Sequence, residues 1–321
     1  MPRLVICVCT CARPRLLAHL LATLERLEPG GLDLAELALV VVDNRPDGAA
    51  RAVCEAARPR LPFRFAFVEE SEPGISFARN RALAEALALG AEHVAFIDDD
   101  DEPRPDWLRH LLRAQEASGA DMVFGTWRHP AALAPPRLLA EVRFFEPIRL
   151  DSFNSYGLPG WAGTFNVLLS RRLIEALATE GPVFRPEFAL TGGGDTDLFI
   201  RAHRAGFAHA TAVDSVVYRV WEPERMTLRG VMRRAFRIGC TRMQLATAHE
   251  PPDRVRKIYR RSCLKLLRSL AKLPPRVVRP ASLAVHLVRA SQHAGEVYAA
   301  SGRRFVYYGT QRGLNVARAG G

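Results

Sequence analysis

The chain has 321 residues, of which 48% are hydrophobic and 25% are charged, and these proportions exclude wholesale disorder. Its formal net charge of +11 favours anionic partners, such as phosphate-bearing substrates or an anionic membrane surface. No run reaches the ~18 consecutive apolar residues that a membrane-spanning helix needs, and the apolar run after Arg3 is too short for a secretory signal. We therefore expect a cytoplasmic protein, a compartment that also suits its scattered cysteines.

The first part of the chain alternates short apolar runs with segments of helical periodicity. Strands are predicted at residues 4–10, 37–42, 63–68, 94–97 and 122–127, and helices at 16–27, at 75–89 and from Pro105 onward. This alternation predicts an α/β fold with a parallel, doubly wound sheet. Ligands of such sheets bind at the carboxyl ends of the strands, where Thr10, Asp43 and Asp98 are expected.

The second part of the chain changes character twice. Residues 130–159 are rich in proline and aromatic residues and are predicted to be irregular, whereas strands are expected at 163–169 and 213–220. Ser170 is placed to cap one helix, and the glycines before Asp195 precede another. We predict a first domain over residues 1–222, a basic helical region over 223–308 and a flexible tail over 309–321.

Four adjacent aspartates, residues 98–101, directly follow the fourth predicted strand. Like charges this close raise one another's pKa unless a cation or full solvation compensates. A hard divalent ion with oxygen ligands provides that compensation and commonly sits between carboxylates and substrate phosphates. The alternative is a solvated acidic loop that caps the next helix.

A series of ordered motifs resembles those of the GT-A-fold glycosyltransferases of family 2, the large inverting group. They lie between Leu4 and Gly239 and read Thr-Cys-Ala-Arg-Pro at 10–14, Val-Val-Val-Asp-Asn at 40–44, Gly-Ile-Ser-Phe-Ala-Arg-Asn at 74–80, Asp-Asp-Asp at 98–100, and Gly-Thr-Phe-Asn at 163–166 before Gly-Gly-Gly-Asp at 192–195. The resemblance implies a Rossmann-like GT-A sheet with flanking helices. It also implies a nucleotide-sugar part at about 1–128 and an acceptor part at about 129–222.

The resemblance assigns a nucleotide-diphosphate sugar donor and roles for its binding residues. Asp43 would accept a hydrogen bond from the base, Asp98 would hold the ribose, and Asp100 would bind Mg²⁺ or Mn²⁺. Thr10, Arg13 and Arg79 would contact the nucleotide. Alternatives from the residues themselves are a turn-forming role for Asp43 and a surface ion pair for Arg79.

Asp195 is the candidate general base, because direct displacement at an anomeric carbon needs a carboxylate at the acceptor hydroxyl. The alternative is a helix cap, with Asp197 as a lesser candidate base. The family usually has Glu-Asp where this chain has Gly194-Asp195. Trp161 and Thr164 are expected near the acceptor, which would be a glycan or a lipid-linked sugar.

Three departures from family patterns refine the expected function. A Gln-x-x-Arg-Trp motif of processive synthases is absent, which favours addition of one sugar at a time. No His follows near Tyr218, where some relatives use one to bind the metal. The Glu that the family usually has before the base is replaced by Gly194, which leaves a catalytically weak binding module as an alternative function. A sugar nucleotidyltransferase is a second alternative, but the segment after the first predicted strand contains no glycine, which argues against it.

Arginine-rich helices are predicted towards the C-terminus. Arg225, Arg229, Arg233 and Arg237 recur every four residues, and a later helix has an expected apolar face at Cys263, Leu266, Leu267 and Leu270. A basic amphipathic helix is typical of peripheral binding to an anionic membrane. The alternative is a helix packed on the catalytic domain. No nucleic-acid-recognition fold is evident, so nucleic acid is not an expected partner.

Overall fold

The computed structural model describes residues 3–29, 31, 33–45, 47–130, 135–145, 149–219, 221, 223–273 and 279–307, and the predicted tail at 309–321 lies outside them. The chain divides into two compact units. The first comprises Met1–Pro130, Ile148–Ala189 and Gly194–Val220, and the second comprises Ala131–Pro147, Leu190–Gly193 and Trp221–Gly321. Across the described ranges, none of the helices combines the length and the apolar character needed to cross a bilayer.

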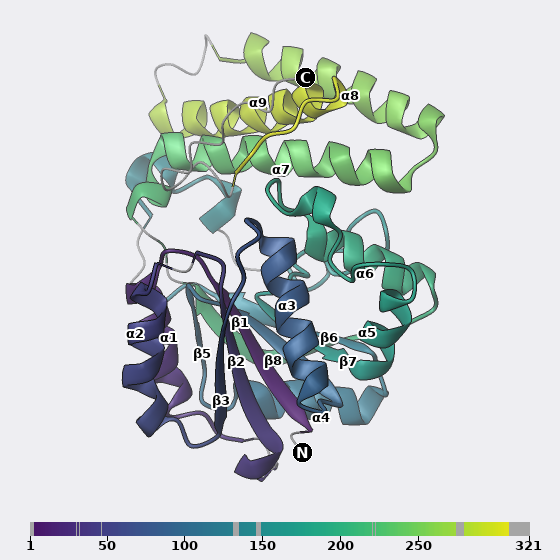
Figure 1. The fold of residues 1–321 in the computed structure, drawn as a ribbon. Coiled ribbons are helices and arrows are strands. Elements are labelled where there is room, and N and C mark those ends of the chain that lie inside the picture. Colours follow the sequence, from purple (N-terminus) through teal and green to yellow (C-terminus); the bar gives the residue numbers. More distant parts are fainter. Residues whose placement is uncertain are drawn as a thin grey trace. The chain divides into compact units, whose positions relative to one another are not determined.

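The first unit is built on an eight-stranded sheet in the order β3-β2-β1-β4-β7-β6-β8-β5 (Figure 1). The strands are β1 (Leu4–Thr10), β2 (Leu37–Asp43), β3 (Arg64–Glu69), β4 (His93–Asp98), β5 (Asp101–Pro103), β6 (Met122–Arg128), β7 (Asn166–Ser170) and β8 (His209–Arg219). The first four are mutually parallel. However, β7 is antiparallel to β4 and β6, and β5 is antiparallel to β8. The expectation of a parallel sheet is therefore wrong for β7 and β5, because antiparallel neighbours need no helical crossover between them.

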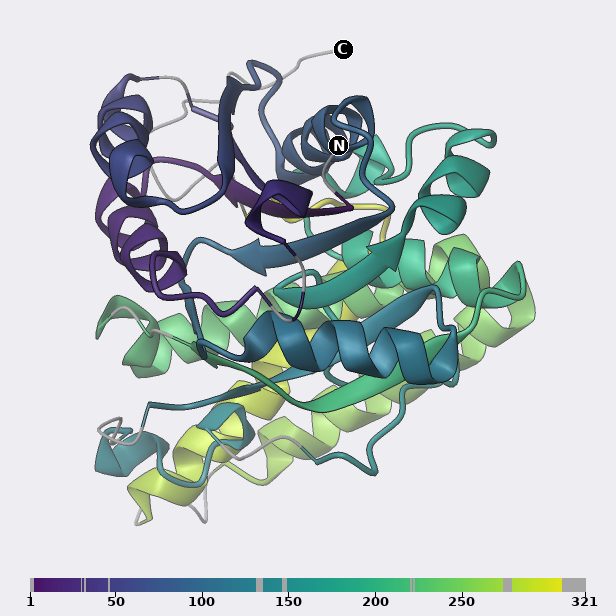
Figure 2. The same ribbon diagram turned by 90° about the horizontal axis from the view of Figure 1, so that it is seen from below.

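Helices cover both faces of this sheet. On one face, α1 (Pro14–Leu24), α2 (Ala49–Ala57) and α4 (Trp107–Ser118) share a core with Leu4, Ile6 and Val8 of β1. On the other face lies α3 (Ile75–Ala88) (Figure 2). The Cys7 thiol of β1 donates to the Ala82 carbonyl of α3 at 3.6 Å. Because β1 and β2 are buried on both faces, their sequences read as continuous apolar runs. The remaining helices of this unit are α5 (Arg171–Ala178) and α6 (Gly194–Arg204).

The second unit contains α7 (Leu228–His249), α8 (Pro252–Ala271) and α9 (Pro280–Ala300), with α9 packed against both others. Glycines bring α7 and α9 together: a Cβ on Gly239 would clash with the carbonyl oxygen of Gln292, and one on Gly295 with that of Phe236. Buried Glu296 of α9 accepts a hydrogen bond from Ser262 of α8 at 2.7 Å. Only backbone without side chains allows this close approach of two helices.

The basic C-terminal segments differ in part from their predicted arrangement. Arg225 lies in a 3₁₀ turn (Pro223–Met226) that precedes α7, so the four-residue stripe is not one continuous helix face. The guanidinium groups of Arg233 and Arg237 lie over the Tyr307 ring, 5.6 and 4.6 Å from its centroid. In α8 the predicted apolar face is divided, because Leu267 and Leu270 are exposed whereas Cys263 and Leu266 are half-buried.

Candidate active site

Three neighbouring strands end side by side at the candidate site. Thr10 of β1 is in register with Asp43 of β2, and Cys9 of β1 is in register with Asp98 of β4. The strands are parallel, so their carboxyl ends meet at one edge of the sheet. The structure thus brings Thr10, Asp43 and Asp98 together.

The acidic segment after β4 forms a compact carboxylate cluster. Ligand oxygens of Asp98, Asp100 and Asp101 all lie within 4.8 Å of one another. Hard oxygen donors at such spacing fit a divalent ion such as Mg²⁺ or Mn²⁺. Asp99 makes different contacts, because its carboxylate accepts hydrogen bonds from the Thr10 hydroxyl at 2.8 Å and from Arg13 Nη1 at 2.9 Å.

The surroundings of these carboxylates disfavour their charged forms. Burial is the main cause that raises the pKa of Asp101 to about 8 and the pKa of Asp99 to about 6, against the lowering effect of nearby arginines. The pKa of Asp98 is also raised, first by loss of hydration and then by the charges of Asp100 and Asp195, with Arg79 opposing. A cation among these groups would offset their repulsion. The cluster is thus electrostatically suited to a divalent ion.

Arg219, at the end of β8, is a residue of this cluster to which the sequence analysis gave no role. Its Nε and Nη2 donate to the Asp101 carboxylate at 3.3 and 3.4 Å. Its guanidinium lies 4.5 Å from the centroid of the Phe165 ring and 5.3 Å from that of Trp127. Burial tends to lower the pKa of Arg219, but the charge of Asp101 and its neighbours outweighs burial and raises it. The sequence signal was an arginine at the end of a predicted strand, near the position where some relatives have a His that helps to bind the metal.

Two further arginines contact the cluster from other elements. Arg13, at the start of α1, donates to Asp100 at 3.1 Å as well as to Asp99. Arg79 of α3 is 9% exposed, and its Nη2 lies 3.8 Å from Asp98 Oδ1. Arg79 therefore contacts the candidate ribose-binding residue, Asp98, from a largely buried position, whereas the Asp98 side chain is 40% exposed.

The start of α3, which carries Arg79, is held by Asn44. The side chain of Asn44 accepts a hydrogen bond from Gly74 N at 2.8 Å and donates to the carbonyls of Glu70 and Glu72 at 3.0 and 2.7 Å. Gly74 has a φ of +135°, and a Cβ there would stand 2.7 Å from the Cβ of Ala189. Glycine is required for this backbone conformation and this close contact.

Asp43 is 1% exposed at the end of β2. One carboxylate oxygen accepts a hydrogen bond from the backbone N–H of Arg45 at 3.0 Å, so the turn-forming contact considered for this residue is present. Burial is the main cause that raises its pKa to about 6. A buried carboxyl with a raised pKa at a strand end is a typical functional-site feature.

Asp195 is the second residue of α6 and lies beside the Gly163 segment. Its Oδ1 accepts a hydrogen bond from Thr196 N at 2.7 Å, and its Oδ2 lies 3.5 Å from the position of a Cβ on Gly163. Its charge contributes to the raised pKa of Asp98, which links it electrostatically to the acidic cluster. The structure therefore brings the candidate base to the same region as the candidate metal ligands.

Asp197, the lesser candidate base, is held by ion pairs in the interior of the fold. It is fully buried and pairs with Arg201 Nε at 3.0 Å and with Arg185 Nη1 at 3.6 Å. A buried carboxylate held by two arginines is not available to an acceptor hydroxyl.

The two candidate acceptor residues lie in the segment before β7. The indole N–H of Trp161 donates to the carbonyl of Gly125 at 3.2 Å. Thr164 is 1% exposed, and its hydroxyl has no hydrogen-bond partner within the described parts of the chain. Thr164 directly follows Gly163, the neighbour of Asp195.

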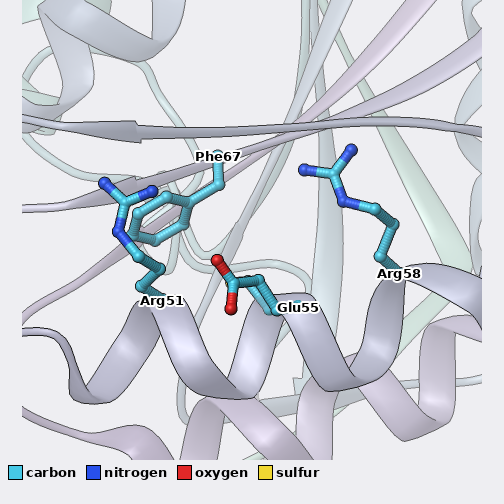
Figure 3. Close-up of a pocket in the computed structure, with 5 residues that line it drawn as sticks. Arg51, Glu55, Arg58 and Phe67 are labelled. Atoms are coloured by element: carbon cyan, nitrogen blue, oxygen red, sulfur yellow. The ribbon is translucent and has the colours of Figure 1, made fainter.

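A small pocket elsewhere in this unit contains none of the predicted site residues. It is lined by Arg51, Cys54, Glu55, Arg58 and Phe67, between α2 and β3. Figure 3 shows Arg51 beside the ring of Phe67, and Arg51 also pairs with Glu69 at 2.8 Å. Arg58 donates to the carbonyl of Phe65 at 3.2 Å. Because both arginines already have partners in the fold, this pocket does not identify a second site.

Comparison with known proteins gives consistent results. Residues 5–158 match the family model described as glycosyl transferase family 2. The chain is 33% identical over 245 residues to the succinoglycan biosynthesis protein ExoM of Rhizobium meliloti (strain 1021). The aligned region covers 74% of this chain and 73% of ExoM.

Solved structures share the fold. The mannosyltransferase PcManGT from Pyrobaculum calidifontis aligns with a TM-score of 0.57 at 21% identity, over 94% of this chain and 86% of that chain. TarS of S. aureus aligns with a TM-score of 0.51 at 16% identity, over 96% of this chain and 56% of that chain. The mixed sheet with its flanking helices is thus of the predicted GT-A type. Together with the sequence match to ExoM over most of both chains, these findings show that the chain belongs to glycosyltransferase family 2 and is a glycosyltransferase.

Proposed function

We propose that this enzyme transfers a single sugar from a nucleotide-diphosphate sugar to a hydroxyl of a glycan or lipid-linked acceptor, with inversion at the anomeric carbon and with bound Mg²⁺ or Mn²⁺. One observation carries the proposal. The carboxylates of Asp98, Asp100 and Asp101 lie within 4.8 Å of one another, and the charge of Asp195 acts on Asp98. Metal ligands and a base in one region are what a direct displacement of a diphosphate requires.

The donor is proposed to bind along the ends of β1, β2 and β4, within residues 1–128. Asp43 would accept a hydrogen bond from the base, and Asp98 would bind the ribose hydroxyls. Thr10, Arg13 and Arg79 line the same edge, and a guanidinium is suited to phosphate and ribose oxygens. Support comes from fold relatives: PcManGT is described in complex with GDP-Man and Mn²⁺, and TarS 1-349, with a TM-score of 0.50, in complex with UDP.

The carboxylates fit a divalent ion, with Asp100 as the principal proposed ligand and Asp98 and Asp101 adjacent. These carboxylates would hold the ion, which would supply Lewis-acid stabilisation of the negative charge that develops on the leaving group. Arg219 and Arg13 hold Asp101 and Asp100 by hydrogen bonds. These contacts limit side-chain movement and so fix the orientation of the acidic groups.

Asp195 is proposed as the base in the acceptor part, residues 129–222. Its Oδ1 is held by Thr196 N, and its Oδ2 is directed towards the Gly163 segment. There it would take the proton of the acceptor hydroxyl as the oxygen attacks the anomeric carbon. The bond from that carbon to the diphosphate oxygen breaks on the opposite side, so configuration inverts. Trp161 and Thr164 would contact the acceptor.

The acceptor and the cellular location belong to the same proposal. ExoM is described as a succinoglycan biosynthesis protein, which supports a glycan or lipid-linked acceptor. The six cysteines all lie in the described parts of the chain and form no disulfide bond, which supports the cytoplasm as the proposed compartment. Association with the inner face of the membrane is part of the same proposal.

The first test is donor binding. Thermal unfolding is measured with UDP, GDP and their sugar conjugates, each with and without Mn²⁺, because a ligand of the folded state raises the melting temperature. We expect stabilisation by one nucleotide class, and we expect chelation with EDTA to remove it. Equal melting temperatures in all conditions would contradict the proposed donor site.

The second test concerns the base and uses the donor found in this way. Asp195→Asn should lower turnover about 10²- to 10⁴-fold while nucleotide binding persists, since general-base catalysis contributes this much. Asp214→Asn, at an exposed position of β8, is the matched control and should leave turnover unchanged. The anomeric configuration of the product, read by NMR, reports inversion. Full turnover in Asp195→Asn would refute the assigned base.

A further inference from the structure

The exposed side of α8 carries large apolar side chains. Leu264, Leu267 and Leu270 are 53%, 63% and 46% exposed, and Tyr259 is 40% exposed. The leucines follow one another at intervals of three residues, so they form a continuous strip, here called the leucine stripe. The opposite side of the helix is occupied, because buried Ser262 donates to Glu296 of α9. The leucine stripe is therefore not the face that holds α8 in its unit.

A strip of positive charge runs beside the leucine stripe. Arg261, Lys265 and Arg268 are exposed and spaced by four and three residues, so they lie on one neighbouring face, here called the basic stripe. The whole helix contains seven Arg or Lys residues and one Asp, a net charge of +6. That Asp, Asp253, lies 3.8 Å from Lys257 at the start of the helix. The excess positive charge is therefore concentrated on the exposed surface.

An apolar stripe flanked by cations has the form of a helix that lies in a membrane interface. In this arrangement leucines enter the boundary between headgroups and acyl chains while Arg and Lys remain at the headgroups. Attraction to anionic lipid adds to the apolar contribution for each basic residue near the surface.

We propose that α8 binds the surface of an anionic lipid bilayer, with the leucine stripe inserted at the interface and the basic stripe at the headgroups. The proposal extends the inferred function, since it supplies a means of holding the enzyme near lipid-linked or membrane-bound acceptors. Lipid binding does not depend on the donor, the metal or Asp195, so its test is separate from that of catalysis.

The test is co-sedimentation of the full chain with vesicles. Vesicles of phosphatidylcholine alone are compared with vesicles of equal parts phosphatidylcholine and phosphatidylglycerol, at low and at high salt. We expect binding to the anionic vesicles at low salt, at least about tenfold weaker partitioning to phosphatidylcholine, and release as added salt shortens the Debye length. Absence of binding to anionic vesicles at low salt would overturn the proposal.

Paired variants separate the two stripes. Leu264→Glu with Leu267→Glu should weaken partitioning about tenfold or more because apolar insertion is lost, and Arg261→Glu with Arg268→Glu should weaken it at least as much on anionic vesicles. The matched controls are Leu150→Glu, at a leucine that is 49% exposed in the other unit, and Arg113→Glu on α4, and both should bind as the unaltered chain does.

Folding and self-association are checked on the same proteins. All substituted side chains of α8 are exposed, so circular dichroism and melting temperature should stay unchanged. Light scattering reports the oligomeric state of the unaltered chain and of the leucine variant. If the leucine variant changes a dimer into a monomer and still binds vesicles fully, the stripe is an interface between copies and the lipid assignment is refuted.

Discussion

Replacing Asp43 by Asn tests whether its buried carboxyl is kept for function at a cost in stability. Its pKa in the fold is raised from the ordinary 3.8 to about 6, mainly by burial. A raised pKa means that the folded state disfavours the carboxylate. The contribution of protonated Asp43 to the free energy of unfolding is therefore fully present below about pH 4, and it is lost as the pH rises through about 6.

The size of the effect follows from the shift. About two pH units at 1.36 kcal/mol each give at most about 3 kcal/mol in the free energy of unfolding at pH 8, and roughly half of this at pH 5. Asn removes the charge but keeps a carbonyl oxygen to accept the hydrogen bond from Arg45 N. Asp43→Asn should therefore be more stable than the unaltered chain, with a gain that grows from pH 5 to pH 8.

Urea unfolding at several pH values measures this gain, and calorimetric titration with the nucleotide found by thermal shift measures binding. We expect weaker nucleotide binding in the more stable variant, the trade-off expected of a functional residue. Asp47→Asn is the matched control, because its side chain is 45% exposed in the same turn region, and it should show no pH-dependent gain. A loss of stability at pH 8, or an equal gain at pH 5 and pH 8, would refute the reasoning.

Three further substitutions probe the packing of the site and of the second unit. Arg219→Met leaves the buried Asp101 carboxylate without its ion-pair partner, so the free energy of unfolding should fall by about 3 kcal/mol at pH 9, above the Asp101 pKa of about 8, where the carboxylate is charged. Arg219→Lys should lose less, and urea unfolding at pH 9 with equal losses would contradict the charge argument. Gly74→Ala forces an Ala to a φ of +135°, so it should lower both the melting temperature and the affinity for nucleotide. Thermal shift and titration measure these two quantities. An unchanged nucleotide affinity would show that the start of α3 does not contribute to donor binding. Gly239→Ala should lower the free energy of unfolding, measured with urea, by about 1 to 3 kcal/mol, because the new Cβ forces α7 away from α9. An unchanged free energy of unfolding would show that the two helices can move apart without loss of stability.

Much of the first unit's secondary structure follows from local pattern. The apolar run of β1 begins and ends as predicted, and Ser170 caps α5 by accepting a hydrogen bond from Leu173 N at 3.2 Å. By contrast, α2 was not predicted, because its buried face consists of the small side chains Ala50, Cys54 and Ala57. The three-residue β5 was also missed, since a strand this short has no period to detect. The direction of β7 depends on the path of an irregular connection, which local pattern does not encode.

The site divides in the same way. Asp43, Asp98 and Asp100 could be proposed because each lies in a short motif at a strand end. The pairing of Asp101 with Arg219 joins residues 118 positions apart, so only the fold reveals it. The close approach of Asp195 to Gly163 is likewise a tertiary contact. Exposure of Leu267 in α8 depends on which side of the helix meets α9, and amphipathic periodicity alone does not determine that side.

The short link between β4 and β5 has a mechanical consequence. β4 lies in the middle of the sheet and β5 forms one margin, yet only Asp99 and Asp100 separate them in the chain. The sheet must therefore curl until that margin returns to its centre, and β5 also packs against α1. The acidic link thus connects the centre of the curled sheet to its margin. A ligand bound at the acidic link should therefore also stiffen the sheet, and increased protection from amide hydrogen exchange in β5 and β8 would report its binding.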